Sequence, residues 1–302
     1  MYDIIIIGAG PAGLTAAIYG TRANKKVLVL EAKTYGGQII NASKIDNYPG
    51  MPHINGIDFA TSLYNQAIEL GASIKFEKVV GLDISNIEKK VITNNGEYIT
   101  KSIIIATGAD KRKLGIEREE ELTGKGVSYC ATCDGMFFKD KDVAVVGGGD
   151  AALKDVEYLS DICNKVYLIH RREEFRGSEK EVIELKSRDN VEFILNSNVT
   201  KLNGSSLLES IEISDKLGNN ATLNISGLFI AVGQVPETTN IVNNIDVDAS
   251  GYIIASEDTK TNVDGVFVAG DVRTKSLRQL ATAISDGAQA AVMACNYINN
   301  NK

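Results

Sequence analysis

The chain has 302 residues, of which 44% are hydrophobic and 24% are charged, and its net charge is −7. A chain of this length can bury a large core and is expected to form about two domains. The acidic balance, with a pI near 5.1, argues against a nucleic-acid-binding surface. An apolar strand is predicted from Asp3 onward, which leaves no room for a targeting sequence, and no apolar run reaches the ~18 residues that span a bilayer. We therefore expect a cytoplasmic protein that binds neither nucleic acid nor membrane.

One sequence unit occurs twice along the chain. The first copy, residues 3–31, reads DIIIIGAGPAGLTAAIYGTRANKKVLVLE, and residues 142–170 align with it without a gap as DVAVVGGGDAALKDVEYLSDICNKVYLIH. Each copy predicts an apolar strand, a glycine turn, an amphipathic helix and a second apolar strand. This order is the βαβ pattern of a dinucleotide-binding unit. The duplication predicts an α/β fold with two Rossmann-like domains.

The glycine turn of the first copy has the spacing that a bound pyrophosphate requires. Gly8 permits the tight turn, Gly10 lets the backbone approach the pyrophosphate, and Gly13 lets the helix pack on the strand. The anion then lies at the helix N-terminus, where unpaired N–H groups and the helix dipole favour it. Glu31 ends the second strand and is expected to accept hydrogen bonds from ribose hydroxyls. This pattern suits FAD; the alternative is a glycine-rich surface turn.

The segment after the first copy is rich in loops up to about residue 60. A helix is predicted at 57–70, and short strands are predicted at 73–79, 90–93 and 97–100. The stretch SIIIATGA at 102–109 predicts a buried strand that ends in a glycine turn.

Two of the four cysteines lie three residues apart in CATCDG, residues 130–135. Zinc requires about four ligands, and the chain has no second cysteine pair and few histidines. We therefore favour a redox dithiol formed by Cys130 and Cys133; half of a zinc site and a chance pair are the alternatives. The other cysteines stand alone in predicted helices and are expected to be small buried apolar residues; they are Cys163 and Cys295.

The second copy ends in basic residues where the first copy ends in an acid. Its turn uses Gly147, Gly149 and Ala152, and His170 stands at the position of Glu31. Planar guanidinium groups bind phosphate well, whereas a carboxylate repels it. This site is therefore predicted to prefer NADPH, with its 2′-phosphate, over NADH. The alternative is a solvated basic face, because two glutamates separate the arginines, which are Arg171, Arg172 and Arg176.

The remaining sequence completes both domains. GLFIAVGQ at 227–234 is comparable to the strand and turn at 102–109, so the duplication extends beyond the βαβ unit. GVFVAGD at 265–271 predicts another apolar strand, and a long helix is predicted at 278–299. This last segment is expected to return to the first domain. We predict an FAD-binding domain and an NADPH-binding domain inserted in it, with the boundaries 1–114, 115–242 and 243–302.

Over essentially its whole length the chain resembles the low-molecular-weight bacterial thioredoxin reductases. The resemblance depends on six motifs in order, namely GAGPAG, GGQ, CATCDG, GGGDAA, HRREEFR and GDVRTKSLRQLATA. It implies a flavoprotein disulfide reductase that passes electrons from NADPH through FAD and the Cys130–Cys133 dithiol to thioredoxin or a thioredoxin-like protein. It also implies a homodimer.

The resemblance assigns roles to single residues. It implies that Cys133 faces the flavin, that Cys130 exchanges with thioredoxin and that Asp134 handles the proton. For FAD it implies a further set of contacts, some of which would otherwise be ordinary polar residues of loops: Pro11, Ala12, Gly37, Gln38, Asn47, Gly108, Gly270, Asp271, Arg278, Gln279 and Leu280. For NADPH the implied residues are Gly147, Gly149, Asp150, Ala151, Ala152, His170, Arg171, Arg172 and Arg176.

The turn GGGDAA departs from the family pattern, which usually has Ser or Thr at the position of Ala151. A hydroxyl that would cap the helix or touch the pyrophosphate is therefore missing. Asp150 also places a carboxylate near an anion site, although Asp is a good N-cap residue. Both features are expected to weaken NADPH binding without outweighing three arginines.

Two other functions are compatible with a flavin and a dithiol. One is a related dithiol oxidase that uses oxygen, or a reductase with a different electron donor or acceptor. The other is a non-enzymatic FAD-binding redox sensor that signals through the cysteine pair. The arginine cluster argues against an oxidase, and a complete second dinucleotide site argues against a sensor, since neither requires NADPH.

Overall fold

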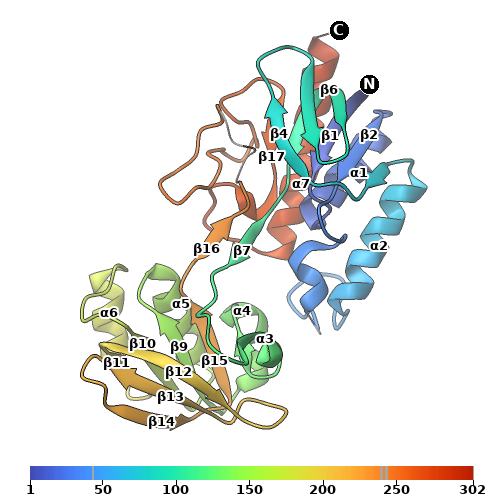
Figure 1. Ribbon diagram of the computed structural model, residues 1–302. Coiled ribbons are helices and arrows are strands. Elements are labelled where there is room, and N and C mark those ends of the chain that lie inside the picture. Colours follow the sequence, from blue (N-terminus) through green and yellow to red (C-terminus); the bar gives the residue numbers. More distant parts are fainter. Residues whose placement is uncertain (43, 239–240, 242–243, 302) are drawn as a thin grey trace. The chain divides into compact units, whose positions relative to one another are not determined.

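The computed structural model describes residues 1–42, 44–238, 241 and 244–301 (Figure 1). They form two compact units, one from Met1–Asp110 with Val235–Lys302 and the other from Lys111–Gln234. The second unit is thus inserted in the sequence of the first. The predicted boundary between residues 242 and 243 lies outside the described residues.

The first unit is built on a seven-stranded sheet in the order β3-β2-β1-β6-β5-β4, with β17 also paired to β6. The pairs β1–β2, β2–β3, β1–β6 and β6–β17 are parallel, whereas β4–β5 and β5–β6 are antiparallel. The strands are β1 (Tyr2–Ile7), β2 (Val27–Leu30), β3 (Ser73–Lys75), β4 (Val79–Asp83), β5 (Lys89–Thr93), β6 (Glu97–Ile105) and β17 (Val266–Val268).

Both faces of this sheet are buried, by different partners. Three helices supply residues to the core on one face, where Ile4 and Ile6 point (Figure 1). Ile5 and Ile7 point to the opposite face, which is covered by segments that include Ile241 and residues 245–272. This alternation explains why β1 is apolar at every position from Ile4 to Ile7. The helices are α1 (Pro11–Arg22), α2 (Gly56–Glu69) and α7 (Leu280–Asn300).

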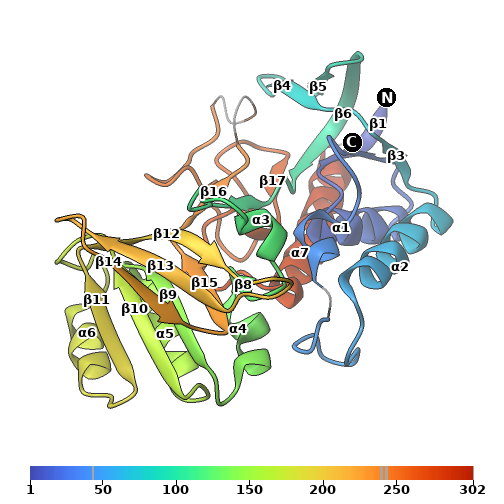
Figure 2. The same cartoon turned by 60° about the horizontal axis from the view of Figure 1, so that its bottom comes forward.

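The second unit has a five-stranded, wholly parallel sheet in the order β11-β10-β9-β15-β8. Its strands are β8 (Val127–Ser128), β9 (Asp142–Gly147), β10 (Lys165–His170), β11 (Val191–Leu195) and β15 (Gly227–Ala231). One face packs against α5 (Asp150–Ser160) and α6 (Glu179–Lys186). The other packs against an antiparallel sheet that was not predicted from the sequence (Figure 2), formed by β12 (Ser197–Asn203), β13 (Ser210–Asp215) and β14 (Asn220–Asn224).

The predicted α/β fold with two Rossmann-like units is confirmed, and the two βαβ units share one register. Ile4 pairs with Val27 in the first unit, and Val143 pairs with Val166 in the second. The gap-free alignment of the two copies makes these two pairs equivalent.

Short elements complete the chain. The segments that cross between the two units form a two-stranded sheet of β7 (Ala109–Lys111) and β16 (Gln234–Pro236). The other short elements are helical turns, namely η1 (Gly37–Asn41), α3 (Glu119–Leu122), α4 (Ala131–Asp134), η2 (Gly135–Phe138) and η3 (Gly270–Val272). Within the described ranges, no helix has the length and apolar character of a membrane span.

Candidate functional site

The turn between β1 and α1 is packed so closely that two positions accept only glycine. Gly8 has φ +106°, and a Cβ there would lie 2.4 Å from the carbonyl oxygen of Ala106. A Cβ at Gly13 would lie 1.9 Å from the carbonyl oxygen of Gly8. Gly10, by contrast, is the N-cap of α1 without a side-chain cap, and a Cβ there would meet nothing closer than 3.9 Å. The N-terminus of α1 is therefore an open cradle of backbone N–H groups, which fits a pyrophosphate.

Glu31 lies directly after β2, at the carboxyl edge of the sheet, as predicted. Its carboxylate accepts hydrogen bonds from the backbone N–H groups of Ala9 and Lys33, both at 2.8 Å. These bonds fix the carboxylate beside the glycine turn, where it can also accept hydrogen bonds from ribose hydroxyls.

Residues distant in sequence gather at the same turn. Gly37 approaches Gly10 so closely that a Cβ on Gly37 would lie 3.3 Å from the Cα of Gly10. Gln38, next along η1, donates its side-chain amide to the carbonyl of Ala109. Gly270 also lies against the turn, because a Cβ there would lie 3.0 Å from the Cβ of Ala12. The structure thus brings the motifs GAGPAG, GGQ and GDV together.

The start of α7 joins a loop from the first half of the chain. Asn47 donates its side-chain amide to the Oε1 atom of Gln279 over 3.0 Å. Gln279 is also the N-cap of α7 and forms a capping box with Thr282, so that Leu280 is the first helical residue. Two predicted flavin residues that lie far apart in sequence are therefore in direct contact.

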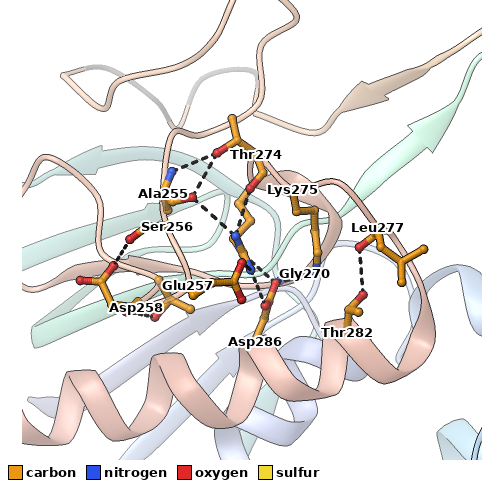
Figure 3. A network of polar contacts seen from close by, with 12 residues as sticks. Ala255, Ser256, Glu257, Asp258, Gly270, Thr274, Lys275, Leu277, Thr282 and Asp286 are labelled. Atoms are coloured by element: carbon orange, nitrogen blue, oxygen red, sulfur yellow. Dashed lines mark hydrogen bonds and ion pairs between the residues drawn. The ribbon is translucent and has the colours of Figure 1, made fainter. Parts of the chain in front are cut away.

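A buried ion cluster holds the turn that carries Asp271 (Figure 3). The carboxylate of Asp286, on α7, accepts hydrogen bonds from the backbone N–H of Gly270 at 3.0 Å and from Lys275 at 2.8 Å. The guanidinium of Arg273 binds the same carboxylate through two nitrogens, each at 2.8 Å. Sequence reasoning missed this cluster, which borders a cavity of about 200 Å³.

The side chain of Arg278 holds the same turn by binding backbone carbonyl groups of that turn. Its guanidinium donates to the carbonyl oxygens of Asp271 at 3.2 Å and Arg273 at 3.1 Å, and it lies 4.0 Å from the ring centre of Tyr252. Arg278 thus fixes the position of Asp271 in this structure.

Gly108, also predicted at this site, has φ +75°, and its carbonyl oxygen accepts a hydrogen bond from the backbone N–H of Glu237.

The second unit repeats the close turn with a different third residue. A Cβ at Gly147 would lie 2.5 Å from the carbonyl oxygen of Ala231 and 2.6 Å from the Cβ of Ala152. Gly149 is the N-cap of α5 without a side-chain cap, and a Cβ there would meet nothing within 4 Å. The Oδ1 atom of Asp150 accepts the backbone N–H of Ser178 at 3.0 Å. Asp150 thus fastens a neighbouring loop, and the N-terminus of α5 remains available to an anion.

His170, the last residue of β10, is a packed residue. It is buried, it stacks on Phe175 with ring centres 4.9 Å apart, and its Nε2 lies 3.1 Å from the carbonyl oxygen of Glu174. A Cβ at Gly148 would lie 2.1 Å from the imidazole ring. Burial lowers the pKa of His170, and the charges of the nearby arginines lower it further, so the ring is neutral at neutral pH.

The three predicted arginines follow this neutral ring in the sequence and are exposed. All three lie within six residues of His170, and the charge of each contributes to lowering the pKa of that ring. The backbone N–H of Arg176 donates to the carbonyl of Gly148 at 2.7 Å, so its loop lies on the glycine turn. This arrangement places cationic side chains beside the dinucleotide cradle, which fits a 2′-phosphate. Arg171 and Arg172 directly follow β10.

Cys130 and Cys133 form a disulfide bond with a Cα–Cα distance of 5.3 Å. Cys130 is the N-cap of α4, and its carbonyl accepts the backbone N–H groups of Cys133 at 3.3 Å and Asp134 at 3.1 Å. Cys130 is half-buried and Cys133 is exposed. The remaining cysteines, Cys163 and Cys295, are free and buried, as expected. Cys295 lies in α7, but Cys163 follows the end of α5 and is not in a helix, contrary to the prediction.

Hydrogen bonds to two carboxylates, which the sequence does not reveal, hold the residues around this disulfide. Ser128 donates its hydroxyl to the carboxylate of Asp134 over 2.6 Å. Glu119, which is fully buried, accepts hydrogen bonds from the backbone of Leu114 at 3.0 Å and from the hydroxyl of Tyr129 at 2.7 Å. Residues directly before and after the redox pair are therefore anchored to the body of the second unit.

Residues 2–287 match the pyridine nucleotide-disulphide oxidoreductase family. The chain belongs to this family. It is 40% identical to the thioredoxin reductase of Peptoclostridium acidaminophilum, covering 100% of this chain and 98% of the relative. It is 41% identical to that of Treponema pallidum, covering 99% and 97%.

Solved structures agree with this assignment. The thioredoxin reductase of Streptococcus pyogenes, 39% identical, has a TM-score of 0.95 with 99% of each chain covered. The FR conformation of the Lactococcus lactis enzyme, also 39% identical, has a TM-score of 0.68 with 99% and 100% covered. The chain is therefore an oxidoreductase with FAD and NADPH as cofactors, which confirms the prediction from the sequence. The two open glycine cradles fit two dinucleotides.

Matched glycine substitutions separate folding from FAD binding. Gly13→Ala is expected to destabilise the apoprotein by about 1–3 kcal/mol, because its Cβ overlaps the carbonyl of Gly8. Gly10→Ala has room for its Cβ and should unfold like the wild type, but its methyl group narrows the cradle and should weaken FAD binding. Thermal unfolding of the apoproteins and fluorescence titration with FAD measure the two effects. Unchanged FAD affinity in Gly10→Ala would place the pyrophosphate elsewhere.

Asp286→Asn should destabilise the first unit strongly, by about 3–5 kcal/mol at neutral pH, because it leaves two buried cations without their anion. The matched control is Glu257→Gln. It removes the other carboxylate near Arg273, which is 93% exposed, and should cost about 0–1 kcal/mol.

The effect of Asp286→Asn should also depend on pH. Burial raises the pKa of Asp286, but the hydrogen bonds and charges of Arg273 and Lys275 outweigh burial and lower it overall. A lowered pKa in the folded state gives stability that is present above the unfolded value of about 3.9 and is lost as the pH falls through the folded value. The difference between wild type and variant should therefore be constant from neutral pH to about 4 and narrow below it. Urea unfolding at several pH values tests this, and a constant difference at all pH values would contradict it.

The double variant Arg171→Ala/Arg176→Ala should raise the KM for NADPH roughly 10- to 150-fold, since a charge-assisted contact is worth about 1.5–3 kcal/mol. The KM for NADH should change little, because NADH has no 2′-phosphate. Lys201→Ala is the control, since it removes an exposed positive charge from the same unit. Steady-state kinetics with both nucleotides provide the measurement, and equal losses would show that these arginines do not recognise the phosphate.

Proposed function

We propose that the protein uses NADPH to reduce the disulfide of thioredoxin or of a thioredoxin-like protein. The observation that carries this proposal is the Cys130–Cys133 disulfide at the start of α4, in the same unit as the second dinucleotide turn. The names of the relatives, which match over the whole chain, support thioredoxin as the acceptor.

The residues divide the work as follows. The first unit holds FAD with the N-terminus of α1, with Glu31 and with Asp271, and the second holds NADPH with the N-terminus of α5 and the arginine cluster. FAD, when bound, relays two electrons from NADPH to the disulfide. Asp134 supplies the proton that one sulfur needs when the S–S bond breaks. Cys130 then attacks the disulfide of the acceptor through a mixed disulfide, and Cys133 resolves it.

The surface beside the disulfide suits a protein acceptor. Met136 and Phe137 follow the redox motif directly, and their side chains are 59% and 44% exposed. Adjacent exposed apolar side chains favour burial against a partner protein. A small oxidant such as oxygen would not require them.

We also propose a homodimer and a cytoplasmic location, both on the family resemblance. The two free, buried cysteines are compatible with a reducing compartment. A molar mass near 32.5 kDa by light scattering would contradict the dimer. Fractionation of the host cell would test the location.

The decisive assay follows NADPH oxidation with and without the thioredoxin of the host. Steady oxidation that depends on thioredoxin is expected. Oxidation that depends only on oxygen would indicate a dithiol oxidase, and no turnover with either acceptor would indicate a sensor.

Single cysteine variants refine the assay. Cys130→Ser and Cys133→Ser should both retain reduction of the flavin by NADPH and lose reduction of thioredoxin. Only Cys130→Ser, which retains Cys133, should show a long-wavelength absorbance from a thiolate lying against the flavin. The same absorbance in Cys133→Ser would reverse the roles of the two sulfurs.

A further inference from the structure

We propose that Ser128 is a positioning residue that fixes which oxygen of Asp134 carries the transferable proton. The inference rests on the proposed function, in which Asp134 supplies a proton to the redox pair. Ser128 lies in β8 and is 4% exposed. Its backbone is held in the parallel sheet by pairing with Phe229 of β15, which fixes the position from which the side chain extends.

The hydroxyl of Ser128 has three polar neighbours. The Oδ2 atom of Asp134 lies 2.6 Å from its Oγ, the backbone nitrogen of Cys130 lies at 3.1 Å, and the carbonyl oxygen of Cys130 lies at 3.4 Å. Ser128 is therefore hydrogen-bonded both to Asp134 and to the backbone of the redox cysteine Cys130.

Counting protons assigns the direction of each bond. The backbone N–H of Cys130 can only donate, so Ser128 Oγ accepts that bond. The single proton of the hydroxyl then has two possible acceptors, and Asp134 Oδ2 is much closer than the carbonyl of Cys130. A separation of 2.6 Å is within the range of an O–H···O hydrogen bond. Oδ2 therefore acts as an acceptor, and a proton that Asp134 transfers is carried on Oδ1.

This assignment fits the redox step. Two electrons that originate from NADPH enter the Cys130–Cys133 bond, which breaks and leaves two sulfur anions. One sulfur takes the proton from Oδ1, so that a thiol, a thiolate and an Asp134 carboxylate result. Ser128 donates to Oδ2 before and after the transfer, and a hydrogen bond to a charged acceptor is stronger than one to a neutral acceptor. The hydroxyl therefore favours the direction of proton transfer that reduces the disulfide.

The test compares Ser128→Ala, Ser128→Thr, Asp134→Asn and the double variant Ser128→Ala/Asp134→Asn in the FAD-loaded enzyme. Rapid mixing with NADPH separates reduction of the flavin from the later reduction of the disulfide. Ser128→Ala should slow the second step about 10- to 100-fold and leave the first unchanged. Ser128→Thr, which keeps the hydroxyl, should restore most of the rate. Ser197→Ala, which removes another buried serine hydroxyl from the second unit, is the control for packing.

The double variant distinguishes positioning from a merely structural role. If Ser128 acts through Asp134, Ser128→Ala adds little to the loss in Asp134→Asn. An equal loss in both backgrounds, or no loss in Ser128→Ala while Asp134→Asn is slow, would overturn the inference and leave the proposed function intact. A full rate in Asp134→Asn would instead remove Asp134 as the proton donor, and the role of Ser128 with it.

Discussion

Both units depend on a backbone turn that approaches its neighbours more closely than a Cβ allows. In the first unit this contact joins Gly13 to the carbonyl of Gly8, and in the second it joins Gly147 to Ala152 and Ala231. Close packing aligns each helix with its strand, so that the unpaired N–H groups of the helix converge on one point. The second unit has Ala152 at the third position, and the Cβ of Ala152 occupies space that a Cβ on Gly147 would need. The same anion cradle thus arises from two slightly different sequences.

The FAD cradle needs parts of the chain that meet only after folding. Gly270 contacts Ala12, and the cluster around Asp286 fixes Gly270 to α7. A buried carboxylate with two cations costs desolvation, which hydrogen bonds on both carboxylate oxygens offset. This requirement gives a physical reason why the last segment of the chain returns to the first unit: without it, Asp271 would have no fixed position beside the turn.

Much of the fold is predictable because local patterns and global structure agree. The duplicated βαβ units, the helix at 278–299 and the cysteine pair follow from periodicity, glycine spacing and residue type, and α7 is observed at Leu280–Asn300. The strands predicted at 97–100 and 102–109 are instead one strand, β6, because pairing continues through the polar residues that interrupt the apolar pattern. The Asp286 cluster and the Ser128–Asp134 bond were not predictable, since a polar side chain reveals its partner only when tertiary structure brings both together. The sheet of β12–β14 was not predicted for a related reason. The sequence pattern of these strands does not show which face of the parallel sheet they cover.

The divergence between the two copies is concentrated at the end of the second strand. Glu31 remains a carboxylate tied to backbone N–H groups, which suits a ribose. His170 turns inward, stacks on Phe175 and is kept neutral by burial and by the surrounding arginines. A charged imidazole there would add a buried cation to three exposed ones, so neutrality lets the arginines gather at low electrostatic cost. In the second copy the strand thus ends in a neutral side chain, and the arginines whose charge suits a phosphate follow it in the loop. One duplicated fold can in this way hold two different dinucleotides in one chain.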